Sequence, residues 1–155
     1  MNGGLMRSAT TRRNALALGL GALTITLTRP ARATPEIMEQ AIKAFTGGKR
    51  VQEGRVTFDI SLLVENGNSV PFSVLVESPM TKADHVTRIG IFNEKNPLPD
   101  VAIFTLTPRC GRASVASRMR LNDTQFITAI AELSDGSYWS AVSEVIVTLP
   151  ACVED

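Results

Sequence analysis

From residue 55 onward, apolar side chains recur at every second position along much of the chain. Val56, Phe58 and Ile60 alternate with polar residues, and the same period returns at 70–76. A period of two is typical of a half-buried β-strand. Strand-like segments also occupy 85–93, 101–106, 113–121, 125–133 and 138–149. Seven short strands separated by short turns predict an all-β fold, an immunoglobulin-like antiparallel β-sandwich, and exclude a doubly wound α/β fold.

One short amphipathic helix is expected before the strands. Thr34 is a suitable N-cap residue, and Pro35 fits the first helical position. Ile37, Ala41 and Phe45 recur every fourth residue, and a Gly-Gly pair follows at 47–48 and ends the pattern. We expect this helix to pack its apolar side against the sheet or against a partner protein.

The segment "ENGNS" joins the first two predicted strands. Asn66, Gly67 and Asn68 are residues that tolerate a positive φ angle. The sequence therefore predicts a tight turn at 66–68.

The first 33 residues have the layout of a cleaved export signal. Arg12 and Arg13 precede an apolar run at 15–27, and an Ala-Arg-Ala triplet ends at Ala33. The apolar run is shorter than the roughly 20 residues of a membrane-spanning helix, so we expect no stable membrane anchor. The paired arginines resemble the twin-arginine export signal. We expect cleavage after Ala33 and a periplasmic location.

The charges of the 155-residue chain are unevenly distributed. The first 33 residues contain 5 of the 16 basic residues and none of the 15 acidic ones. The rest of the chain has 11 basic against 15 acidic residues, a net charge of about −4. A mildly acidic body without a basic stripe argues against nucleic-acid binding.

The sequence contains none of the usual catalytic or metal-binding patterns. Its single histidine, His85, cannot form a metal site with two cysteines that lie 42 residues apart, and no Gly-rich phosphate loop or GxSxG elbow is present. Tyr138 and Trp139 are expected to face opposite sides of a strand and to pack in the core. We therefore expect no cofactor, no metal and no enzymatic activity.

The chain ends "VIVTLPACVED", in which a cysteine is the fourth residue from the end. Pro150 cannot continue a β-ladder, so the last strand is expected to stop there and to leave Cys152 on a short tail. The predicted organisation is a signal peptide at 1–33, a helical region at 34–50, a β-sandwich at 51–149 and a tail at 150–155.

Four segments of the chain resemble the SoxY family, the sulfur carriers of the bacterial Sox thiosulfate-oxidation system. They read "ENGNSVPFSVLVESPMT", "FNEKNP", "TPRCGRASVASRMRL" and "AIAELSDGSYWSA". Family members end in a Gly-Gly-Cys-Gly-Gly tail, whereas this chain has "PACVED". The resemblance implies a non-enzymatic carrier that pairs with a SoxZ subunit as a heterodimer.

The resemblance also implies the site and its partner enzymes. Cys152 corresponds to the cysteine on which the family attaches its sulfur intermediates covalently. In the family, a haem enzyme joins thiosulfate to this thiol, a hydrolase releases sulfate, and a dehydrogenase oxidises the remaining sulfur.

Two alternatives to this carrier role stay open. In the first, the chain is a diverged paralogue that assembles with SoxZ without carrying sulfur. In the second, it is a redox protein in which Cys152 forms a disulfide with Cys110 or with another chain. An exported protein meets an oxidising compartment, where such a disulfide can persist.

Overall fold

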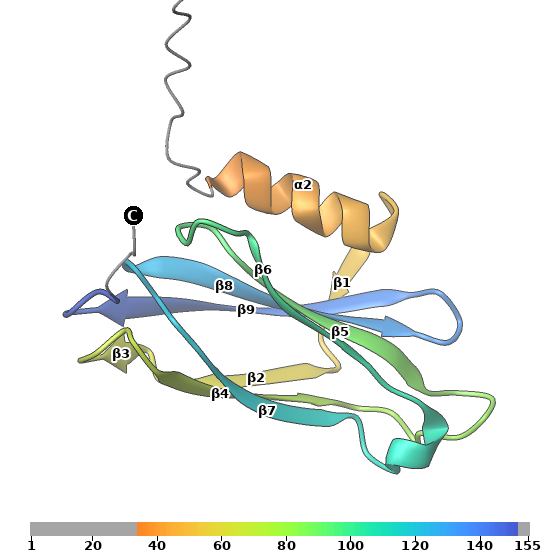
Figure 1. Cartoon of the computed structure of the whole chain (residues 1–155). Helices are drawn as coiled ribbons and strands as arrows, with labels where there is room; N and C mark the ends of the chain where they lie inside the picture. The colour runs from red at the N-terminus through yellow and green to blue at the C-terminus, as the bar shows by residue number, and fades with distance from the viewer. Residues whose placement is uncertain (1–33, 152–155) are drawn as a thin grey trace, which may run out of the picture.

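The computed structural model describes residues 34–151, which form two β-sheets and one helix (Figure 1). The elements, in chain order, are α2 (Pro35–Thr46), β1 (Val51–Glu53), β2 (Val56–Ile60), β3 (Leu63–Val64), β4 (Val70–Val76), β5 (Val86–Asn93), β6 (Asp100–Thr105), the 3-10 turn η1 (Pro108–Cys110), β7 (Ser114–Met119), β8 (Gln125–Leu133) and β9 (Tyr138–Val147).

The strands form a large and a small sheet packed face to face. The large sheet has the order β1-β9-β8-β5-β6, with β3 also paired to β9, and the small sheet has the order β2-β4-β7. Their facing sides enclose one core, whose fully buried members include Val74, Ile89, Ile127 and Val145. The predicted immunoglobulin-like β-sandwich with an N-terminal helix is confirmed, and the seven predicted strands correspond to β2 and β4–β9.

Two short strands, β1 and β3, were not predicted. Val51 pairs with Tyr138 and Leu63 pairs with Ile146, and both pairings with β9 are parallel, whereas the other strand pairs are antiparallel. Strands of three and two residues are too short to show a period of two. Their pairing depends on β9, which lies more than eighty residues further along the chain.

Helix α2 lies across the outer face of the large sheet (Figure 1). The Thr34 hydroxyl accepts a hydrogen bond from the Ile37 amide, and Gly47 ends the helix with a φ of 63°. Phe45 packs against Phe92 and Tyr138. The apolar side of the helix is therefore covered by the chain's own sheet, which is the first of the two packing partners expected for it.

Only part of the outer face is covered by α2. Further along β8 and β9, the side chains of Phe126, Val142 and Ile146 lie on the same face and are 44–58% exposed. Leu63, next to Ile146 in the sheet, is 58% exposed. An apolar patch of these four side chains, called here the open face, remains on the described part of the chain.

Candidate functional site

The end of the sandwich that precedes Cys152 is built by a three-segment backbone clamp. The Gly67 amide donates to the Leu149 carbonyl (2.8 Å), the Leu121 amide donates to the Gly67 carbonyl (2.8 Å), and the Ala151 amide donates to the Leu121 carbonyl (2.9 Å). Ala151 is only 6% exposed, so its methyl group packs within the fold. The chain thus stays attached to the sandwich through Ala151, after the end of β9 at Val147.

Gly67 serves this clamp in a way that the sequence did not indicate. Its φ angle is not positive; the residue is needed because a Cβ atom there would lie 2.1 Å from the Leu121 carbonyl oxygen and 2.9 Å from the Ala151 nitrogen. The tight turn predicted at 66–68 is present, but none of its three residues adopts a positive φ angle. The turn is instead formed by Asn66, whose side-chain oxygen accepts from the Asn68 amide (3.0 Å).

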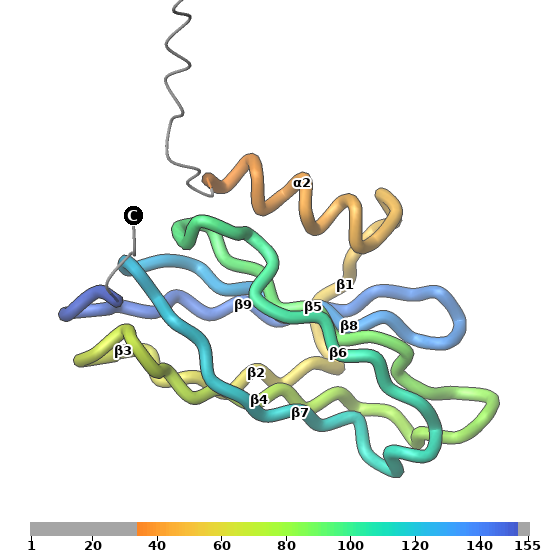
Figure 2. Tube along the Cα trace, viewed as in Figure 1, coloured from red at the N-terminus to blue at the C-terminus, as the bar shows by residue number. Residues whose placement is uncertain are grey.

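A network of side-chain amides holds the two loops beside the clamp together. Asn96 donates to the Arg120 carbonyl (2.7 Å), and Asn122 donates to the Lys95 carbonyl (2.9 Å). Gln125, which is 2% exposed, donates to the Asn96 side chain (3.1 Å). These bonds fix the β5–β6 loop against the connection from β7 to β8, which Figure 2 shows crossing from the small sheet to the large sheet.

Several sequence-predicted functional residues lie outside the described residues 34–151. They are Arg12 and Arg13 of the export signal, Ala33 at the expected cleavage site, and Cys152. The last described residue before Cys152 is Ala151, which the clamp binds to Leu121.

Cys110 lies at the opposite end of the sandwich. It is exposed, and it closes the 3-10 turn η1 before β7. The six residues of β7 alone span about 17 Å, and Cys110 and Leu121 lie beyond its two ends. A disulfide needs Cα atoms within about 7 Å. Cys110 is therefore far from Leu121, to which Ala151 is bound, and the alternative in which Cys110 pairs with Cys152 stays a prediction because Cys152 lies outside residues 34–151.

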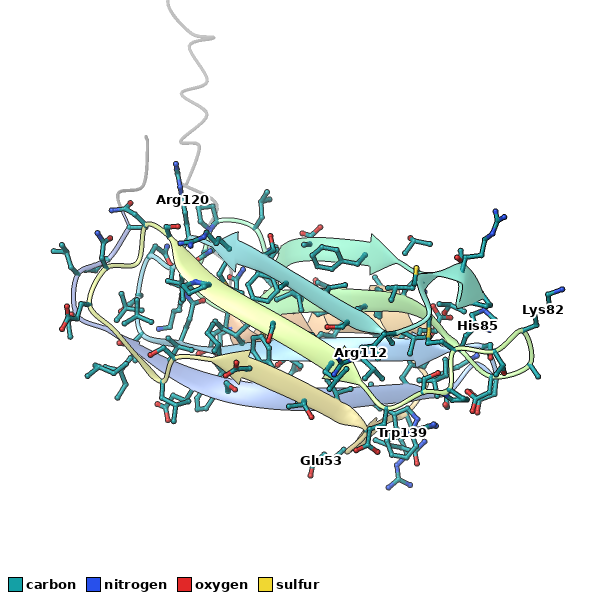
Figure 3. All side chains as sticks on the ribbon, turned by 90° about the horizontal axis from the view of Figure 1, so that it is seen from below. Glu53, Lys82, His85, Arg112, Arg120 and Trp139 are labelled. Carbon is teal, nitrogen blue, oxygen red and sulfur yellow. The ribbon has the colours of Figure 1, made fainter. Side chains whose placement is uncertain are left out.

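His85 is also remote from the clamp. Figure 3 shows His85 and Lys82 at one end of the sandwich and Arg120 at the other. His85 is half-buried, and its Nδ1 atom has no hydrogen-bond partner among the described residues. Within residues 34–151, no three His, Cys, Asp or Glu side chains come close enough to hold a metal ion.

Tyr138 and Trp139 face opposite sides of β9, as their alternation predicts. Tyr138 is buried beneath α2, whereas Trp139 packs toward the core between the sheets. The Tyr138 hydroxyl donates to Glu132 (2.9 Å), which also pairs with Arg88. Burial raises the pKa of Glu132, but the hydrogen bonds from Arg88 and Tyr138 outweigh burial and hold it below its ordinary value of 4.5.

The same network attaches α2 to the large sheet. Arg88 donates to the Phe45 carbonyl (3.2 Å), and its guanidinium lies 4.5 Å from the centre of the Phe45 ring. The hydrogen bond with Glu132 raises the pKa of Arg88, although burial opposes the rise. These two charges are paired with each other and serve the helix contact, so they do not form part of the candidate site.

Comparison with known proteins places the fold and the family. The sulfur carrier protein SoxY from Chlorobium limicola f thiosulfatophilum shares 32% sequence identity, covers 72% of this chain and 96% of its own, and has a TM-score of 0.61. Two further matches share the fold alone. Superoxide reductase (neelaredoxin) from Ignicoccus hospitalis shares 17% identity, covers 74% of this chain and 94% of its own, and has a TM-score of 0.54. A putative superoxide reductase from Thermotoga maritima shares 17% identity, covers 66% of this chain and 89% of its own, and has a TM-score of 0.52.

The family profile described as sulfur oxidation protein SoxY matches residues 42–152, which extends from α2 to the cysteine of the tail. No curated protein sequence matches the chain. Among the helices of residues 34–151, none is long and apolar enough to cross a membrane. From the profile match and the Chlorobium structure together, the chain belongs to the SoxY family of sulfur oxidation proteins.

Proposed function

We propose that this chain is a periplasmic carrier that holds thiosulfate-derived intermediates covalently on Cys152 and presents them to the Sox enzymes. The observation that supports the proposal best is the clamp at Ala151 in a chain of the SoxY family. A carrier cysteine must be reachable by large partner enzymes, and it must also start from a defined position. The bound position of Ala151 supports the second requirement, because Cys152 is the next residue along the chain.

The chemistry of loading follows from the thiol. The thiolate is the nucleophilic form of cysteine. When thiosulfate is joined to Cys152, a sulfur–sulfur bond forms, the thiol proton is released, and an electron pair passes to the haem enzyme. Hydrolysis then breaks the bond to the sulfonate group with the oxygen of water, releases sulfate and leaves a persulfide on the cysteine.

The carrier role predicts a specific modification in cells. On thiosulfate-grown cells, mass spectrometry of the peptide that contains Cys152 is expected to show thiosulfonate or persulfide mass, and the Cys110 peptide is expected to show none. A Cys152→Ser strain loses thiosulfate oxidation, whereas a Cys110→Ser strain retains it. Undiminished oxidation in the Cys152→Ser strain, with no second carrier encoded, would favour the assembly-module alternative instead.

Pairing with a SoxZ subunit is the second part of the proposal. The open face on β8, β9 and β3 supports this pairing. The apolar side of α2 does not, because the chain's own sheet already covers it. Solvent-exposed apolar patches of this kind are typical of protein interfaces. We expect a heterodimer in which the open face is buried.

The pairing is tested with purified chains. Val142→Asp is expected to weaken binding to SoxZ in size-exclusion and calorimetry experiments, because it places a charge in an apolar contact. Leu98→Asp is the control, since Leu98 is 68% exposed and lies on the β5–β6 loop rather than on β3, β8 or β9. A wild-type chain that stays a folded monomer at micromolar concentration in the presence of SoxZ would contradict the pairing.

A further inference from the structure

Strand β9 is covered along only part of its outer edge. Its residues 138–140 pair with β1, and its residues 146–147 pair with β3. Between these two short strands the chain leaves the large sheet and forms β2, which pairs with β4 in the small sheet. Within residues 34–151, positions 141–145 of β9 therefore pair with β8 alone. This stretch of β9 is called here the edge gap.

Two residues of the edge gap direct their backbone groups into it. The Ile146 amide donates to the chain just before β3 (2.8 Å), and at the far end of the β8–β9 ladder the Leu133 amide donates to the Ser137 carbonyl (3.0 Å). Because the direction of hydrogen bonding alternates along a strand, both bonds place the amides and carbonyls of Val142 and Glu144 away from β8. Outside the strand ladders of residues 34–151, no hydrogen bond to these four groups is recorded.

The edge gap is long enough for a short strand. The distance from Ser140 to Ile146 is about 20 Å, at about 3.4 Å per residue, and it leaves room for about four residues between β1 and β3. A hollow of about 390 Å³ lies at the β1 end of the gap, and its lining residues are Glu53, Gly54, Val56, Ser140, Ala141 and Val142. This hollow can receive a side chain of an incoming segment.

The strands around the gap carry only acidic charges. The sequences of β1, β3, β8 and β9 contain glutamate but no lysine or arginine. Glu132 is paired with Arg88, whereas Glu53 and Glu144 are exposed and have no ion pair recorded in the described part of the chain. Figure 3 shows Glu53 at the long edge of the sandwich, directed away from its body. The gap therefore has two acidic groups that are free to face a partner.

The open face borders the edge gap on the outer side of the sheet. Glu144 shares this side with Val142 and Ile146, because side chains two positions apart on a strand share a face, and it pairs across the ladder with Phe126. A second copy of this chain would bring like charges together, since residues 34–155 contain 11 basic against 15 acidic residues. The surface instead fits a different protein that presents a basic side chain next to an apolar one.

We propose that the partner subunit adds an extended segment to β9 in the edge gap, with a basic side chain opposite Glu144 and an apolar side chain opposite Val142. In such strand addition, main-chain hydrogen bonds give affinity, and alternate side chains give specificity. Opposite charges that face each other on neighbouring strands favour the pairing. The inference rests on the proposed heterodimer and specifies how its two chains meet.

Amide hydrogen exchange tests the strand pairing directly. With SoxZ bound to the full mature chain, exchange at the amides of Val142 and Glu144 is expected to slow by about tenfold or more. The control is the amide of Ile103 on β6, the other edge of the large sheet; it faces outward because the Leu106 amide donates to β5. Its exchange is expected to stay the same. Unchanged exchange at Val142 and Glu144 in a formed complex would overturn the inference.

The charge of the partner segment is tested by calorimetry on Glu144→Lys. This change is expected to weaken binding to SoxZ about tenfold, because it places like charges opposite each other. Glu144→Gln should weaken binding less and reduce its dependence on salt. Glu77→Lys is the control, since Glu77 is exposed and follows β4 in the small sheet, and it should leave the affinity unchanged. Binding that Glu144→Lys leaves intact or strengthens would mean that Glu144 only protects an exposed edge, and would overturn the inference.

Failure of this inference is distinguishable from failure of the heterodimer. If SoxZ does not bind the wild-type chain, both proposals are wrong. If SoxZ binds and protects amides elsewhere, the heterodimer stands and the edge gap is not its contact. Neither measurement depends on Cys152, so both are independent of whether the chain carries sulfur.

Discussion

One end of the sandwich contains Cys110, and the other end contains Ala151, the residue before Cys152. The two ends are built differently. At the Cys110 end, the chain makes a short 3-10 turn that Gly111 closes with a φ of 69°, and a Cβ atom on Gly111 would meet nothing within 4 Å. At the Cys152 end, Gly67 is so tightly enclosed that a Cβ atom would overlap the Leu121 carbonyl. One end is an open turn, and the other is a packed clamp.

This difference shows that the fold holds the chain at Cys110 and the chain just before Cys152 in two different ways. Cys110 is exposed on a local turn whose hydrogen bonds join residues at 107–111 to one another. The segment before Cys152 is held instead by residues from two distant parts of the chain, Gly67 and Leu121. A carrier thiol gains a defined starting position from such a clamp, and an exposed turn gives only access.

The largest expected effect comes from adding a methyl group at Gly67, where the backbone of the clamp leaves no room for a side chain. Gly67→Ala is expected to lower the free energy of unfolding by about 3 kcal/mol, because the added methyl group meets rigid backbone atoms. Gly111→Ala, at the other end, is expected to cost about 1 kcal/mol, from its positive φ alone. Urea unfolding measures both. Equal losses would show that the two ends are not built differently.

A smaller effect is expected from removing one hydrogen bond of the clamp. Ala151→Pro eliminates the amide that binds the Leu121 carbonyl and is expected to cost about 1 kcal/mol in urea unfolding. Ala151→Gly keeps the amide and is expected to retain more of the stability than Ala151→Pro does. Equal losses from the two variants would show that this hydrogen bond does not stabilise the fold.

The smallest effect is expected between the two ends, at Glu132. Since its pKa in the folded chain is below 4.5, its carboxylate stabilises the fold above about pH 4.5, and this stabilisation is lost as the pH falls through the lowered folded pKa. Both charges are partly exposed, so we expect about 1 kcal/mol or less. Glu132→Gln should remove this part of the pH dependence and leave the reactivity of both cysteines unchanged. The measurement is urea unfolding from about pH 3 to 7, roughly the range over which carboxylates titrate.

The sequence was sufficient to predict the main strands and the helix because their patterns are local. The alternation at Val56, Phe58 and Ile60 and the capping of α2 by Thr34 depend on neighbouring residues only. The short strand β3 shows no such pattern, since it depends on pairing with Ile146. Local order was therefore predictable, and pairing across the fold was not.

The candidate site was predictable only in part for the same reason. A cysteine near the terminus is visible in the sequence, but the contact of Ala151 with Leu121 joins positions thirty residues apart. In the sequence, Gly67 resembles any turn glycine. Only the meeting of the three segments in the fold shows that the backbone at Leu121 and Ala151 leaves no room for a Cβ atom there.

The parallel pairing of β1 and β3 with β9 has a consequence for the order in which the chain can fold. Val51 finds its partner at Tyr138, and Leu63 finds its partner at Ile146, so both early strands must wait until almost the whole polypeptide has left the ribosome. Contacts between such distant positions slow folding. The last strand to be synthesised is thus the one that completes the sheet, and a chain truncated before β9 leaves β1 and β3 without partners.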